Sequence, residues 1–155
     1  MAEAGGGSVE VSGALPAASG GLSAARVEAA VRTVLEAESA EVEEVSVVFL
    51  GDGEISEMNR RFLGRDHATD VLAFPLHETG KPVVGDIFLG ADQVARQAAD
   101  HEVPHREEVL RVVVHGTLHL LGYDHPEDET RTESDMWRRQ EALVARLSMG
   151  DGEGG

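Results

Sequence analysis

Two periods of hydrophobic residues alternate along the chain, one typical of strands and the other of helices. Val45, Val47 and Phe49 occupy every second position, which places them on one face of a strand over 42–50. Over 24–37 the apolar residues instead follow a helical stripe, and Ser23 before it is a good N-cap. The remaining pattern predicts strands over 8–12, 71–75 and 83–90, helices over 54–63, 92–99 and 128–147, and a long helix from Pro104 to Gly122.

The order of these elements predicts an α+β domain, with a small mixed β-sheet of about four strands covered by helices. Gly85 interrupts the fourth strand and indicates a bulge or a close approach of another segment. In the helix over 54–63, Ile55, Met58 and Phe62 are expected to point inward. In the last helix, we expect Trp137 to belong to the apolar face that points inward.

The length of 155 residues fits one domain that buries a sizeable core. The first residues are rich in Gly and Ala, so we expect 1–7 to be disordered. Residues 8–148 are then the domain, and 149–155 a flexible C-terminal tail.

Cysteine is absent, so neither a disulfide framework nor a thiolate metal site is available, and histidine would have to bind any zinc. The sequence has no signal peptide pattern and no apolar run approaching the ~18 residues of a membrane span. We therefore expect a soluble, cytoplasmic protein with no membrane partner.

The formal net charge of −16 argues against a broad nucleic-acid-binding surface, because such a surface would repel a polyanion. An RNA substrate would need a local basic patch, a metal ion or a partner protein to bind.

Three histidines follow the apolar run that ends at Val114. His115 and His119 are four residues apart, so in a helix their side chains share one face. Gly122 can end the helix, and the chain then turns back so that His125 can reach the same point. Three neutral imidazoles suit one Zn²⁺ per chain and leave a fourth position for water, as in catalytic sites.

A plainer interpretation is that these histidines pack a helix against its neighbours beside a turn. The spacing His-x3-His-x2-Gly-x2-His is also that of the metzincin peptidases. There a Glu follows the first histidine as general base, whereas Gly116 occupies that position here. The pattern thus favours a metal site but not peptidase chemistry.

With this motif and these strands, the chain resembles the YbeY family of bacterial rRNA-maturation endoribonucleases. The resemblance extends from about Val9 to Leu147. It rests on three blocks: Met58-Asn59 through Thr69-Asp70-Val71-Leu72-Ala73-Phe74-Pro75, Gly85-Asp86-Ile87-Phe88-Leu89, and His115 to His125. Met136 and Glu141 also fall in the family's closing helix.

The resemblance implies a single-domain, single-strand-specific, metal-dependent endoribonuclease that binds zinc through His115, His119 and His125. It implies a role in 3′-end maturation of small-subunit (16S) ribosomal RNA and in ribosome quality control. Ribosomal RNA and the small ribosomal subunit or its proteins would then be the partners, and no DNA partner is expected.

The chain departs from the family just before the glycine of the loop, where an Arg implicated in the RNase activity is replaced by Leu63. Arg60, Arg61 and Arg65 are the candidates to supply the missing charge. Arg65 is the candidate closest in sequence, because it follows the flexible Gly64. As solvated surface charges, the three arginines would need no such role.

Asp124 is the acid nearest in sequence to the ligands, and it is a candidate general base or a residue that orients an imidazole. It can equally cap local backbone in a turn. Three hypotheses follow: a zinc-dependent endoribonuclease, a metallohydrolase of another substrate such as a peptide, or a non-catalytic ribosome-assembly factor stabilised by zinc.

Overall fold

The computed structural model describes residues 7–13, 21–123 and 133–154. In chain order the elements are β1 (Ser8–Gly13), α1 (Ala24–Ala37), β2 (Val42–Leu50), α2 (Asp52–Leu63), β3 (Val71–Pro75), β4 (Val83–Gly90), α3 (Ala91–His101), α4 (His105–Leu120) and α5 (Glu133–Gly154).

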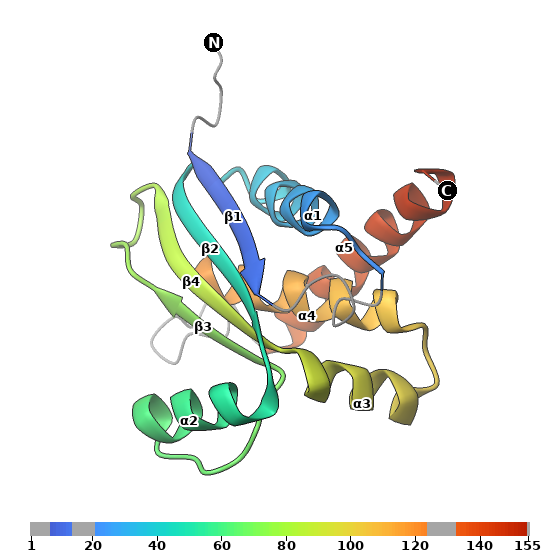
Figure 1. Cartoon of the computed structure of the whole chain (residues 1–155). Helices are drawn as coiled ribbons and strands as arrows, with labels where there is room; N and C mark the ends of the chain where they lie inside the picture. The colour runs from blue at the N-terminus through green and yellow to red at the C-terminus, as the bar shows by residue number, and fades with distance from the viewer. Residues whose placement is uncertain (1–6, 14–20, 124–132, 155) are drawn as a thin grey trace.

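The four strands form one mixed sheet in the order β1-β2-β4-β3. β1 and β4 both run parallel to β2, and β3 pairs with β4 in the antiparallel sense. The helices α1, α4 and α5 lie on one side of this sheet (Figure 1). The predicted α+β fold with a small mixed sheet covered by helices is therefore confirmed.

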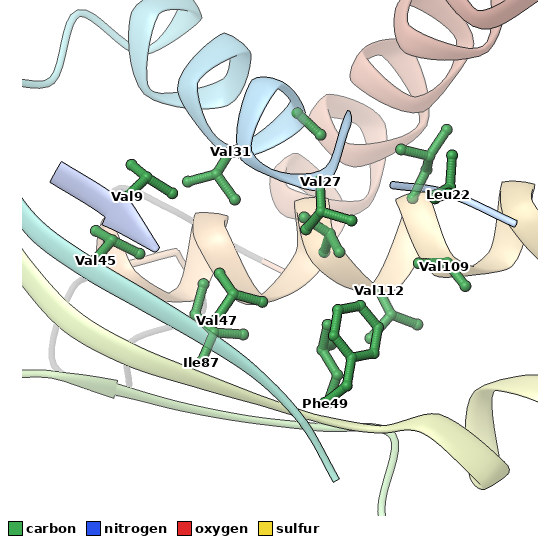
Figure 2. Packing of buried hydrophobic residues seen from close by; sticks show 14 of the residues in the cluster. Val9, Leu22, Val27, Val31, Val45, Val47, Phe49, Ile87, Val109 and Val112 are labelled. Atoms are coloured by element: carbon green, nitrogen blue, oxygen red, sulfur yellow. The ribbon is translucent and has the colours of Figure 1, made fainter. Parts of the chain in front are cut away.

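The core lies between the inner face of the sheet and the helices α1 and α4. Val45, Val47 and Phe49 of β2 are buried, as their alternation predicts. They pack against Val27 and Val31 of α1 and against the apolar face of α4 (Figure 2). α4 contacts α1, α3 and α5 as well as β3 and β4, so it is the central helix.

Two glycines allow α4 to lie close against the sheet. A Cβ on Gly116 would lie 2.9 Å from Ile87 Cγ2 and 3.0 Å from Val71 Cγ2. A Cβ on Gly85 would lie 2.7 Å from Leu120 Cδ2, so the close approach predicted at this glycine is made by α4 itself. The glycines thus fix how deeply the histidine-bearing helix sits on β3 and β4.

Two side chains expected to point inward are exposed. Phe62 is 59% exposed, and the side chain buried near it on α2 is Asn59, which donates to the carbonyl of His67 at 2.9 Å. Trp137 is 63% exposed because it follows the buried Met136 by one position, which turns its side chain about 100° away. The final helix continues past its predicted end at residue 147 to Gly154.

Gly116→Ala is expected to destabilise the fold by about 1–2 kcal/mol, since the added methyl meets β-branched side chains that cannot rotate away. The matched control is Gly53→Ala in α2, where a Cβ would meet nothing within 4 Å. That change should be neutral or stabilising by up to about 1 kcal/mol. Urea denaturation measures both, and equal stability of the two variants would contradict the packing account.

Candidate metal centre

The helix α4 brings His115 and His119 together one turn apart. Their Nε2 atoms are 3.0 Å from each other, and the ring centroids are 4.6 Å apart with the ring planes at 78°. Both side chains are half-buried. The two imidazoles therefore converge with the same ring nitrogen, as the four-residue spacing predicts.

Gln140 of α5 contacts the other ring nitrogen of His115. Its Oε1 lies 2.6 Å from His115 Nδ1, and its Nε2 donates to Glu141 Oε2 at 3.1 Å. An amide oxygen can only accept, so Nδ1 of the neutral imidazole carries the proton. The lone pair of His115 is then on Nε2, the atom that faces His119.

This pair fits two ligands of a zinc site. Nitrogens about 2.0–2.1 Å from a shared zinc ion lie about 3.3 Å apart in a tetrahedral arrangement, close to the separation of the two Nε2 atoms. The predicted third ligand, His125, lies outside the described residues, as does Asp124. Among the residues that the structure describes, no group of three metal-binding side chains occurs.

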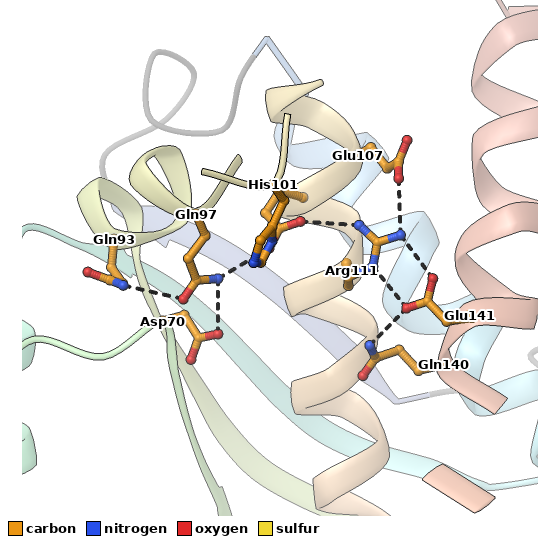
Figure 3. A network of polar contacts seen from close by, with 9 residues as sticks. Asp70, Gln93, Gln97, His101, Glu107, Arg111, Gln140 and Glu141 are labelled. Carbon is orange, nitrogen blue, oxygen red and sulfur yellow. Dashed lines mark hydrogen bonds and ion pairs between the residues drawn. The ribbon is translucent and has the colours of Figure 1, made fainter. Parts of the chain in front are cut away.

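Gln140, which contacts His115, belongs to a network of polar and charged side chains (Figure 3). Arg111 of α4 donates from Nε and Nη2 to the two carboxylate oxygens of Glu141, each at 2.9 Å. It also donates to Glu107 at 3.0 Å and to the buried Glu108 at 3.1 Å. The hydrogen bond from Arg111 is the main cause that lowers the pKa of Glu141, and the same contact raises the pKa of Arg111.

A cavity of about 310 Å³ opens beside His115 and Gln140, between α3, α4, α5 and the start of β3. Gln97 of α3 spans it, with its Nε2 at 3.3 Å from Asp70 Oδ2 and 3.2 Å from Glu108 Oε2. Asp70 and Glu108 in its lining are acidic, and Arg111 is already paired with three carboxylates, so a phosphate group entering the cavity needs a further positive charge.

Asp70 is held by its backbone as well as by its side chain. Its carbonyl accepts from the N–H of Gly90 at 2.8 Å. A Cβ at Gly90 would lie only 2.1 Å from the carbonyl oxygen of Thr69, so this approach requires glycine. The loop after α2 is therefore fixed at the end that reaches the cavity.

The turn after α4 is held from two sides. Gly122 has φ 94°, the left-handed conformation predicted at this glycine. Tyr123 donates to Glu38 Oε1 at 2.8 Å, and Arg139 of α5 donates to the second oxygen of Glu38. The last described residue before the segment of Asp124 and His125 is thus tied to α1 and α5.

The proposed cation Arg65 is exposed, as are Leu63 and Arg60. Arg60 is paired with Glu57 at 2.6 Å. The sequence reasoning missed Gln140, Arg111 and Glu108 as neighbours of the histidines. A signal was present for Arg111, which is the one charged residue in the otherwise apolar run 109–114 and follows Glu108 by three positions.

The position after the first histidine faces the sheet. A side chain at Gly116 would collide with Ile87 and Val71, away from the point that the two Nε2 atoms share. A metzincin-type glutamate general base therefore does not fit at this position, which argues against the peptidase hypothesis on geometry as well as on residue type.

Comparison with known proteins identifies the family. The family model described as Endoribonuclease YbeY matches residues 19–148. The chain belongs to the YbeY endoribonuclease family. An Endoribonuclease YbeY of Persephonella marina is 38% identical over 113 residues, covering 69% of this chain and 72% of the relative. One of Alkaliphilus oremlandii is 35% identical over 130 residues, covering 79% and 85%.

A solved structure agrees with the fold of this YbeY family member. The solution structure of TM1509 from Thermotoga maritima aligns with a TM-score of 0.67 at 28% identity, covering 95% of this chain and 93% of that one. The resemblance read from the three sequence blocks is thereby confirmed. Within the described residues no helix is both long and apolar enough to span a membrane.

Proposed function

We propose that this chain is a single-strand-specific, zinc-dependent endoribonuclease acting in 3′-end maturation of small-subunit (16S) ribosomal RNA and in ribosome quality control. The observation that supports it most is the histidine pair of α4, whose Nε2 atoms converge at 3.0 Å in a member of the YbeY family. One zinc ion per chain is held by His115, His119 and His125, which completes three nitrogen ligands.

When bound, zinc supplies a Lewis acid for a phosphate oxygen and lowers the pKa of a bound water to about 7. The protein's own residues orient the reaction. Gln140 directs the His115 imidazole, and Asp124 serves as general base or orients an imidazole from the turn. RNA also carries its own nucleophile in the ribose 2′-OH.

Arg65 is proposed to offset the charge of the RNA phosphates. A chain with net charge −16 needs a local cation where a polyanion approaches, and Leu63 at the family's Arg position cannot supply it. Arg65 is exposed and makes no ion pair with another described residue. Its loop ends at Asp70, which lines the cavity beside His115.

Ribosomal RNA and the small ribosomal subunit or its proteins are the proposed partners, and the cytoplasm the proposed location. The acidic surface makes capture of naked RNA weak, so a protein partner on the ribosome would strengthen binding.

The second candidate is a non-catalytic ribosome-assembly factor in which zinc only stabilises the fold. Leu63, 49% exposed in place of the family's Arg, is the observation that favours it. The two functions differ in one property, because only the enzyme cleaves RNA.

The wild-type protein should carry about one zinc per chain and cleave ribosomal RNA or small subunits, but not casein. His119→Ala should lose most of the metal and the cleavage, since two ligands bind far more weakly than three. Metal analysis and gel-resolved cleavage measure both properties. Equal zinc content in the variant would contradict the metal site, and zinc binding without cleavage would favour the assembly factor.

Arg65→Ala should lower RNA cleavage by at least about tenfold, equivalent to ~1.4 kcal/mol of transition-state stabilisation. Zinc content and thermal stability should stay nearly unchanged, because Arg65 is exposed. Arg60→Ala is the matched control, since Glu57 already pairs with that guanidinium. If Arg65→Ala cleaves like the wild type while Arg60→Ala does not, the phosphate contact belongs to the other residue.

A further inference from the structure

We infer that Gln140 is a positioning residue that fixes the tautomer and direction of the His115 imidazole, and that Glu141 and Arg111 fix the direction of the Gln140 amide. The expected effect of Gln140 on zinc affinity rests on the proposed zinc site, whereas its expected effect on the tautomer of His115 does not.

The amide of Gln140 has two different ends, and the structure distinguishes them. Its Nε2 donates to Glu141 Oε2 at 3.1 Å, and its Oε1 lies 2.6 Å from His115 Nδ1. A flipped amide would put its oxygen against the carboxylate of Glu141, so that two acceptors would face each other. Gln140 is only 7% exposed, and an unpaired polar group there would be costly. The orientation with Oε1 towards His115 is therefore imposed by Glu141.

Glu141 in turn is held by a two-pronged contact. Arg111 donates from Nε and Nη2 to both of its oxygens, each at 2.9 Å (Figure 3). This planar arrangement fixes the carboxylate plane as well as its position. Arg111 is itself anchored on its own helix by Glu107 and by Glu108, whose side chain is 3% exposed. Arg111 thus fixes the orientation of the Glu141 carboxylate, which in turn fixes the orientation of the Gln140 amide.

The result at His115 is a proton on Nδ1 and a lone pair on Nε2, facing His119. Groups that hold a ligand imidazole in this way affect metal affinity by about 10–100-fold when removed. The device spans two helices that are far apart in sequence, because α4 supplies the imidazole and Arg111 while α5 supplies Gln140 and Glu141.

The first test is nitrogen NMR of the metal-free protein with labelled histidine, which reports which ring nitrogen carries the proton. Wild-type His115 should show the Nδ1–H tautomer. Gln140→Leu removes the acceptor and should shift His115 towards Nε2–H. Gln93→Leu is the matched control, because the amide of Gln93 also bonds neighbouring side chains but no histidine. It should leave the tautomer of His115 unchanged.

The double variant Gln140→Glu/Glu141→Gln exchanges the two side chains at constant charge. Position 140 then still presents an acceptor to His115, because both oxygens of a carboxylate accept. This variant should retain the wild-type tautomer, which a purely packing role of Gln140 does not require. Glu141→Leu leaves Gln140 in place but frees its amide to flip, so it should give a mixture of tautomers and serves if Gln140→Leu fails to fold.

The second test is zinc affinity by chelator competition. Gln140→Leu should bind zinc about 10–100-fold more weakly than the wild type, and the double variant and Gln93→Leu about as tightly as the wild type. An unchanged His115 tautomer in both Gln140→Leu and Glu141→Leu would overturn the inference. If the tautomer shifts as expected but the wild type binds no zinc, the inference stands and the proposed zinc function fails.

Discussion

The contact of α4 with the sheet is the constraint on which the rest of the molecule depends. Gly116 lets the helix lie against Ile87 and Val71, and Gly85 leaves room on β4 for Leu120. Neighbouring residues on a helix point about 100° apart, so with Gly116 against the strands, His115 is turned towards α5 and the cavity. The depth and rotation of one helix therefore decide both the core and the candidate metal centre.

The charged network beside the histidines orients side chains more than it stabilises the fold. Burying Glu108 and Arg111 costs desolvation, which their mutual attraction offsets only with good geometry. Here the geometry is good, because Arg111 contacts three carboxylates. One of them, Glu141, in turn orients the amide of Gln140. The network also reaches Asp70 through Gln97, so hydrogen bonds connect the end of the loop after α2 with the network beside the histidine pair.

The sequence predicted the elements well where the apolar period was regular, and it predicted the histidine pair because both residues lie on one helix. It could not predict Gln140, which reaches His115 only through the packing of α5 on α4 across 25 residues. It also misplaced Phe62, since α2 buries only Ile55 and Asn59 and leaves the apolar residues of its last turn exposed. There Phe62 packs edge-on against Phe74, with ring centroids 5.6 Å apart.

The most direct test of the proposed zinc centre is X-ray absorption spectroscopy of the zinc-loaded protein, compared with His125→Ala. The account predicts three imidazole nitrogens at about 2.0–2.1 Å with one further light-atom ligand, and loss of one imidazole in the variant. A zinc shell built mainly from carboxylate and water oxygens, or one that His125→Ala leaves unchanged, would contradict a centre formed by His115, His119 and His125.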